Sequence, residues 1–145
     1  MANFTDSLSI GKKVENEVCE LIQKKYPKAY VKEGYYKACD IIVPETNTLV
    51  EVKLDRKSHE TGNFLIEIEF DGVESALSTT KADWWVLVDR DFFYWITPES
   101  LRHIISNLNL RVAEFVGNGD TRSKKAYLVP KEKIIYSSYT ITMKR

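Results

Sequence analysis

The spacing of apolar residues predicts one long helix at the start of the chain. Between Thr5 or Asp6 and Lys25, apolar positions recur at helical intervals, and Pro27 ends the segment. The stripe consists of Val14, Val18, Leu21 and Ile22. Two further helices are predicted, one in "TPESLRHIISNL", where Thr97 is the cap and Pro98 the first helical residue, and a short one near "KEKII".

Alternation of apolar and polar residues predicts several strands. In "FLIEIEF" the apolar residues Phe64, Ile66, Ile68 and Phe70 share one face. Further strands are expected at 29–32, 40–43, 49–54, 111–116 and 127–130, in a hairpin around Arg90 and Asp91, and in the tail "YTITMKR". "PETNT" is expected to be a turn, "DRKSHETGN" and "GNGDTRSKKA" loops, and "DGVESALSTTKA" a short helix or loop.

This order of elements predicts an α/β or α+β domain, with a mixed central β-sheet flanked by helices. The chain has 145 residues and neither an internal repeat nor a linker-like segment, so one domain is expected over residues 1–145.

Composition narrows the function. Lys plus Arg and Asp plus Glu both number 21, so the formal net charge is zero and any nucleic-acid contact must come from a local basic patch. No stretch reaches the ~20 apolar residues of a membrane span, and the N-terminus lacks a signal pattern. Cys19 and Cys39 make neither a disulfide framework nor a zinc motif, so a cytoplasmic setting is expected.

One stretch, "CDIIVPETNTLVEVK", places charged residues among apolar ones. If "ETNT" is the loop, Pro44 faces Leu49 and Asp40 stands opposite Lys53. Glu51 shares a face with Lys53 whatever the register, because alternate residues of a strand point the same way. On the first helix, Glu15 lies within about 50–60° of the centre of the apolar stripe and is expected to point towards the sheet.

Three carboxylates and a lysine at one place favour Mg²⁺ or Mn²⁺ and the hydrolysis of a phosphate ester. The alternative is a solvent-facing hairpin with ordinary alternating polar positions, and a Glu15 that merely borders the apolar stripe.

The motifs "GKKVENEVCELI", "CD" and "LVEVK" together resemble the PD-(D/E)XK nuclease superfamily, whose fold is restriction-endonuclease-like; Cys39 stands where the family name has proline. The resemblance covers roughly residues 7–90. It implies that Asp40 and Glu51 bind the metal with the carbonyl of Val52. It also implies that Glu15 helps to hold the metal or its water, and that Lys53 positions or activates the nucleophile.

The prediction is a Mg²⁺- or Mn²⁺-dependent DNA nuclease, most simply an endonuclease. The alternatives are a nuclease-like fold that binds nucleic acid or protein without cutting, and a plain structural domain. The hairpin "WWVLVDRDFFYWI" is a candidate homodimer interface, and "TRSKKA" a candidate mobile clamp on DNA. The candidate phosphate contacts are Lys12, Lys13, Arg56, Lys57, Lys81, Lys124 and Lys125.

Overall fold

The computed structural model describes residues 4–34, 38–116 and 122–145. Its helices are α1 (Phe4–Gln23), α2 (Ser58–Thr61), α3 (Pro98–Ser106) and α4 (Lys131–Ile135). Its strands are β1 (Tyr30–Val31), β2 (Ile41–Val43), β3 (Thr48–Leu54), β4 (Asn63–Phe70), β5 (Val73–Glu74), β6 (Trp84–Val88), β7 (Phe92–Ile96), β8 (Val112–Val116), β9 (Ser123–Pro130) and β10 (Ile141–Lys144). The predicted mixture of helices and strands is confirmed.

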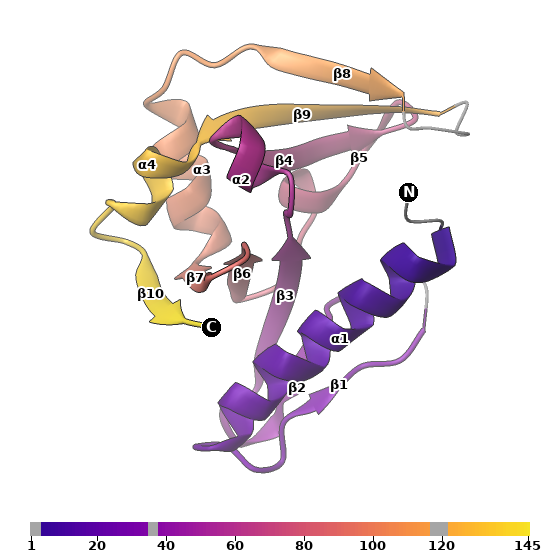
Figure 1. Cartoon of the computed structure of the whole chain (residues 1–145), viewed down its shortest axis with the longest axis vertical. Helices are drawn as coiled ribbons and strands as arrows, with labels where there is room; N and C mark the ends of the chain where they lie inside the picture. Colours follow the sequence, from indigo (N-terminus) through magenta and orange to yellow (C-terminus); the bar gives the residue numbers. More distant parts are fainter. Residues whose placement is uncertain (1–3, 35–37, 117–121) are drawn as a thin grey trace.

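The strands form two sheets, where the sequence predicted one. The first has the order β1-β2-β3-β6-β7-β10 and is mixed, because β3 and β6 run parallel while the other neighbours run antiparallel. The second has the order β5-β4-β9-β8 and is antiparallel throughout. In Figure 1 the four-stranded sheet lies crosswise above the carboxyl end of β3.

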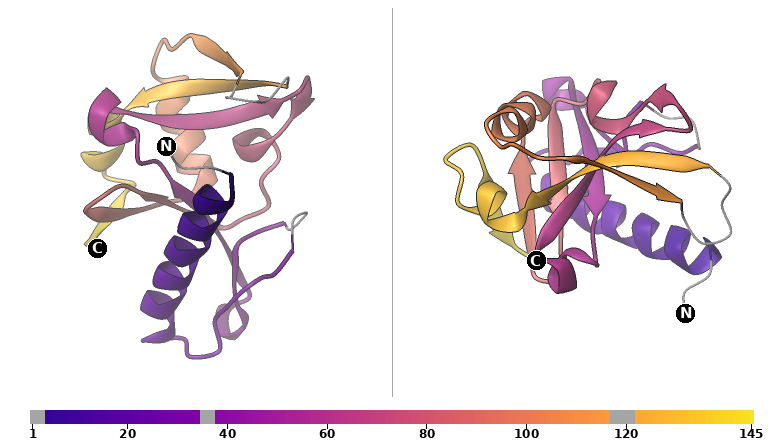
Figure 2. Two further views of the ribbon diagram at one scale, coloured as in Figure 1. Left: turned by 45° about the vertical axis from the view of Figure 1, so that its right-hand side comes forward. Right: turned by 90° about the horizontal axis from the view of Figure 1, so that it is seen from above.

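The two faces of the mixed sheet are covered differently. Helix α1 packs Val14 and Val18 against one face, where Val50 and Val86 are buried. The other face, which carries Trp85 and Leu87, is covered by β4, β9, α3 and α4 through the buried residues Phe64, Ile66, Leu101, Ile105, Val129 and Ile134. Figure 2 shows α1 and the four-stranded sheet on different sides of β3. A sheet, and not only helices, therefore completes the second layer.

The turn between β2 and β3 corrects the expected register. A short 3₁₀ turn, Pro44–Thr46, is followed by Asn47 with a left-handed φ of 51°. An asparagine tolerates that conformation, and it turns the chain early enough for Val43 to pair with Thr48. Ile41 consequently pairs with Val50, and the Asp40 amide bonds to the Val50 carbonyl, so Asp40 does not stand opposite Lys53. The shift is two residues, so every side chain stays on its predicted face.

The expectation of a loop at "SKKA" is also wrong. Ser123–Pro130 forms β9, which pairs with β4 on one side and β8 on the other. Two lysines fit in this central strand because each lies beside a carboxylate of β4: Lys125 is 3.2 Å from Glu69, and Lys124 is 4.0 Å from Glu67. Residues 117–121 of the predicted loop, which include Thr121 of the predicted clamp, lie outside the described residues.

The predicted α3 start is confirmed, since Thr97 Oγ1 accepts a hydrogen bond from the Ser100 amide at 3.1 Å and Pro98 opens the helix. Within the part of the chain that the structure describes, no helix combines the length and the apolar character needed to cross a membrane.

Candidate functional site

Asp40 sits where β2 and β3 part. Its backbone N–H donates to the carbonyl of Val50 at 3.0 Å, which continues the hairpin ladder by one residue. Its side chain is 6% exposed, and Oδ2 accepts a hydrogen bond from the Val52 amide at 2.7 Å. A buried carboxylate must be hydrogen-bonded to offset its desolvation. The carboxylate replaces the next ladder partner that β2 would have supplied.

Glu51 and Lys53 point to the face of the sheet opposite α1. Their neighbours Val50 and Val52 belong to the core beneath α1, so strand alternation turns Glu51 and Lys53 the other way. The Lys53 ammonium lies 5.3 Å from the centre of the Trp85 ring, which belongs to the opposite core. Trp85 is also the Cα partner of Glu51 across β3 and β6. The structure thus brings Asp40, Glu51 and Lys53 to the carboxyl half of β3.

The edge of β3 beyond Asp40 borders a groove. The Val50 carbonyl and the Val52 amide both point to the β2 side. In an extended strand the N–H and C=O of one residue point the same way, so the Val52 carbonyl also faces that side. A groove of about 450 Å³ runs there, lined by Ile10, Gly11, Val52, Lys53, Leu54, Asp55, Arg56 and Lys57. The Val52 carbonyl therefore lies beside a groove whose wall carries the cations of Lys53, Arg56 and Lys57.

Glu15 approaches from the other layer. It is half-buried on α1, which packs on the face of the sheet opposite Glu51 and Lys53. Gln23 Nε2 bonds to the Ala29 carbonyl, and the Lys12 ammonium pairs with Glu33 at 2.9 Å, so α1 runs antiparallel to the segment from Ala29 to Glu33. From the Lys12–Glu33 pair, three residues along the helix cover about the same length as one residue along the extended segment, so Glu15 lies about level with Lys32. The Lys32 amide in turn donates to the Asp40 carbonyl.

The candidate phosphate contacts divide into two groups. Arg56 and Lys57 line the groove, and Lys12 and Lys13 lie on α1 just after Gly11. Lys81 instead precedes Asp83, which bonds to Leu49 at the opposite end of β3. Lys124 and Lys125 belong to the second sheet and lie beside carboxylates. The structure therefore brings Arg56 and Lys57 together with Lys53, places Lys12 and Lys13 on α1 beside the groove residue Gly11, and places the second group elsewhere.

The donor atoms at Asp40, Glu51 and Val52 are all oxygens, which suits Mg²⁺ or Mn²⁺ better than softer ions. Among the described residues, no three His, Cys, Asp or Glu side chains form a metal-binding group. Mg²⁺ commonly uses only one or two protein carboxylates and takes its other ligands from water and phosphate. The residues present fit such an ion in chemistry and number.

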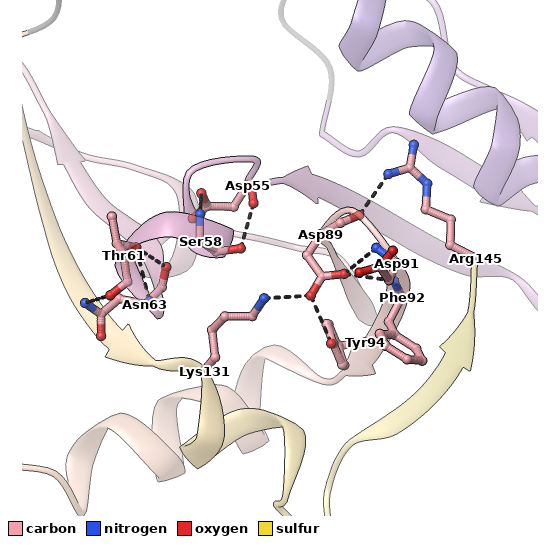
Figure 3. Close-up of polar contacts among 10 residues, drawn as sticks. All are labelled: Asp55, Ser58, Thr61, Asn63, Asp89, Asp91, Phe92, Tyr94, Lys131 and Arg145. Carbon is pink, nitrogen blue, oxygen red and sulfur yellow. Dashed lines mark hydrogen bonds and ion pairs between the residues drawn. The ribbon is translucent and has the colours of Figure 1, made fainter.

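A second buried carboxylate, that of Asp89, was not predicted from the sequence. It follows β6 directly and is 4% exposed. Figure 3 shows Asp89 between Lys131 and Tyr94, with Oδ2 accepting from the Lys131 ammonium at 2.7 Å and from the Tyr94 hydroxyl at 2.9 Å. Oδ1 accepts from the amides of Asp91 and Phe92. The sequence signal for Asp89 was an acidic residue at the end of an apolar run. Its partner Lys131 lies 42 residues away in the sequence, so the pair could not be recognised from local pattern.

These contacts set the ionisation of Asp89. Burial by itself raises the pKa of this carboxyl, but the hydrogen bonds from Lys131, two backbone amides and Tyr94 outweigh burial, and the net pKa lies below its ordinary value. Burial, followed by the hydrogen bond to Asp89, raises the pKa of Tyr94 well above that of a free tyrosine. Asp89 is therefore a charged structural centre that fixes the β6–β7 turn to the start of α4.

Asp55, the first residue of the triplet Asp55-Arg56-Lys57, shapes the loop after β3. Its Oδ1 accepts from the Ser58 amide at 3.0 Å and its Oδ2 from the Leu65 amide at 2.8 Å. Figure 3 shows Asp55 beside Ser58, whose hydroxyl also donates to the Asp55 carbonyl at 2.8 Å. The carboxylate thus ties α2 and β4 to the end of β3, and it holds Arg56 and Lys57 at the groove.

No protein-family model matches the chain, and the curated proteins and the solved structures likewise gave no match.

Proposed function

We propose that this protein is a metal-dependent nuclease that hydrolyses phosphodiester bonds in DNA, with a restriction-endonuclease-like core formed by α1, β1, β2, β3 and β6. One observation carries the proposal: the Asp40 carboxylate is anchored on the amide of Val52, the residue between Glu51 and Lys53, and Val52 and Lys53 line a groove that also carries Arg56 and Lys57. A strand-leading aspartate next to Glu-x-Lys on the adjacent strand is the arrangement that the resemblance implies for catalysis.

Each residue has a role in this proposal. Asp40, Glu51 and the Val52 carbonyl would hold Mg²⁺ or Mn²⁺, with Glu15 assisting at the metal or its water. Such an ion polarises a phosphoryl oxygen and lowers the pKa of bound water. Asp40 Oδ2 is fixed by the Val52 amide at 2.7 Å, so the carboxylate is held in place before any ligand binds. Lys53 stabilises the negative charge that develops on the phosphate.

The groove supports DNA as the substrate class. Lys53, Arg56 and Lys57 place three cations along about 450 Å³ of space, although the chain as a whole has no net charge. Phosphate contacts fix the register of a nucleic acid without reading its sequence. Lys12 and Lys13 on α1 are the next candidates, and Lys81, Lys124 and Lys125 would contact only parts of a long substrate. With both cysteines free and buried, we place this activity in the cytoplasm.

A cleavage assay tests the proposal. Linear duplex, single-stranded, circular and four-way-junction DNA are incubated with Mg²⁺, with Mn²⁺ or with EDTA. We expect metal-dependent cutting that Glu51→Gln and Lys53→Met each reduce by about 100-fold or more. Glu74→Gln and Lys28→Met are the matched controls, since both residues are exposed, Glu74 lies on β5 opposite Glu69, and Lys28 lies beside Glu45 at the turn before β3. Binding without any cutting would replace the nuclease by the binding-module alternative, and neither binding nor cutting would reject both.

A further inference from the structure

Lys53 contacts an aromatic ring at the proposed site. Its ammonium lies 5.3 Å from the ring centre of Trp85, which is the distance range of a cation–π interaction. Lys53 is half-buried on β3, and Trp85 lies on the neighbouring parallel strand as the Cα partner of Glu51. The ring therefore lies on the same face as both side chains of the Glu-x-Lys motif.

The ring itself is held rigidly. Trp85 is 1% exposed and packs in the core beneath the second sheet. Its indole Nε1 donates to Thr80 Oγ1 at 3.1 Å, and the same hydroxyl oxygen accepts from the Ala82 amide at 3.2 Å. A long lysine side chain loses several rotatable bonds when it is fixed, so a rigid surface beneath the ammonium reduces the freedom that catalysis must remove.

Comparison with another lysine on the same side shows what is particular to this pair. Lys131 lies 5.2 Å from the ring of Phe64, but its ammonium is fixed by the Asp89 carboxylate at 2.7 Å. The Lys131 charge is thus neutralised within the fold. Trp85 attracts the Lys53 ammonium through the face of its ring and adds no formal negative charge of its own.

We propose that Trp85 is a positioning residue: its indole face holds the Lys53 ammonium beside Glu51, where the phosphate of the substrate would lie. This inference rests on the proposed nuclease function. Indole is the strongest of the aromatic side chains in binding a cation, which gives a reason for tryptophan at a position where other large apolar residues would also fill the core.

The first test is a double-mutant cycle on the cleavage rate. Trp85→Leu removes the ring, Trp85→Phe keeps a ring but loses the bond to Thr80, and Lys53→Met removes the cation. We expect Trp85→Leu to lower kcat about tenfold and Trp85→Phe to lower it by a smaller factor. In the Lys53→Met background, neither substitution should lower kcat below that of Lys53→Met itself. Leu101→Ala, in the same core, is the control for lost packing. An equal loss in both backgrounds would show that Trp85 acts only through stability.

The second test needs no activity. A proton above an indole ring is shifted upfield in NMR spectra, so the Lys53 ε-methylene should show such a shift in the wild type and in Trp85→Phe. The shift should be lost in Trp85→Leu; its absence from the folded wild type would overturn the inference. Should Trp85→Leu not fold, Trp85→Phe completes the cycle. If the wild type cuts no DNA, both the proposed nuclease function and this role of Trp85 are rejected. If the wild type is active but the effects of the Trp85 and Lys53 substitutions on kcat are additive, only the role of Trp85 is rejected.

Discussion

Among single residues, Asp89 has the clearest energetic role. Its carboxylate is almost wholly buried and accepts four hydrogen bonds, one of them from the Lys131 ammonium at 2.7 Å. Removing one partner of such a pair leaves a charge buried without compensation, which costs far more than a surface ion pair contributes. The pair consequently controls both the stability of the fold and its dependence on pH.

The substitution Lys131→Met tests this role. We expect it to lower the free energy of unfolding by about 3 kcal/mol at pH 7. Because the pKa of Asp89 is lowered in the fold, its stabilising effect is complete above about pH 4 and declines as the pH falls through the folded value. Urea unfolding between pH 7 and pH 3 should therefore show a smaller loss of stability in Lys131→Met than in the wild type. Equal slopes would contradict this account.

The raised pKa of Tyr94 predicts that the stability of the fold also declines at high pH. Its folded pKa is raised, chiefly by burial and then by Asp89, so the unfolded chain releases the phenolic proton first. Stability due to Tyr94 is complete below about pH 10 and declines above it. Tyr94→Phe should lower stability by about 1 kcal/mol at pH 7 and weaken the decline between pH 10 and 11, as measured by urea unfolding. A decline as steep as that of the wild type would contradict the assignment.

Asp40 offers a test of metal binding that is separate from cleavage. Asp40→Asn keeps an oxygen that can accept from the Val52 amide but removes the negative charge. We expect an unchanged thermal midpoint without metal and at least a tenfold weaker affinity for Mn²⁺, measured by calorimetry. Asp83→Asn is the matched control, because Asp83 accepts from the Leu49 amide at 2.8 Å near the other end of β3. Equal loss in both variants would argue against a metal at Asp40.

Among the elements, α1 contributes a glycine to the groove wall. Gly11 lines the groove, and a Cβ added there would meet no atom within 4 Å. Gly11→Ala should therefore stabilise α1 by about 0.5–1 kcal/mol and leave the KM for DNA unchanged. Gly11→Phe should fill the groove and raise KM at least tenfold. An unchanged KM in Gly11→Phe would show that substrate does not enter by this groove.

The sequence predicted most of the helices and strands, but it did not predict which distant strands and side chains pair with one another. Periodicity located α1, the β2–β3 hairpin, the α3 cap and β10, since these depend on residues close in sequence. The pairing of Phe64 with Val129 depends on residues far apart, and so does the contact of Asp89 with Lys131. Strand alternation fixed which face Glu51 and Lys53 share, but only the left-handed turn at Asn47 fixed which residue Asp40 meets.

On the scale of the whole molecule, the net charge is zero, so any affinity for DNA must come from a local group of cations. If Lys53, Arg56 and Lys57 supply the phosphate contacts, the logarithm of the binding constant should fall with the logarithm of salt concentration with a slope of about −3. The double variant Arg56→Ala, Lys57→Ala should reduce the slope by about 2, as measured by fluorescence anisotropy with EDTA present. A slope unaffected by this variant would place the contacts elsewhere, with Lys81, Lys124 and Lys125 as the next candidates.

Self-association is also a property of the whole molecule. The hairpin of β6 and β7 occupies the interior of the mixed sheet, and seven of its ten strand residues are buried in the chain's own core: Trp85, Val86, Leu87, Val88, Phe93, Tyr94 and Ile96. A homodimer through this hairpin stays a prediction, and it would have to use Phe92, Trp84 and Trp95. Sedimentation velocity at micromolar concentration tests it, since a monomer would exclude this interface.

The long-range pairing of β4 with β9 has a consequence for how the chain reaches its native state. During synthesis, the apolar residues Phe64 and Ile66 leave the ribosome more than 60 residues before Val129 and Tyr127, their partners on β9. Closing so long a loop is entropically costly, and folds dominated by such contacts form slowly. The growing chain therefore carries β4 as an unpaired apolar strand until β9 has been synthesised, and exposed strands of this kind are prone to aggregate.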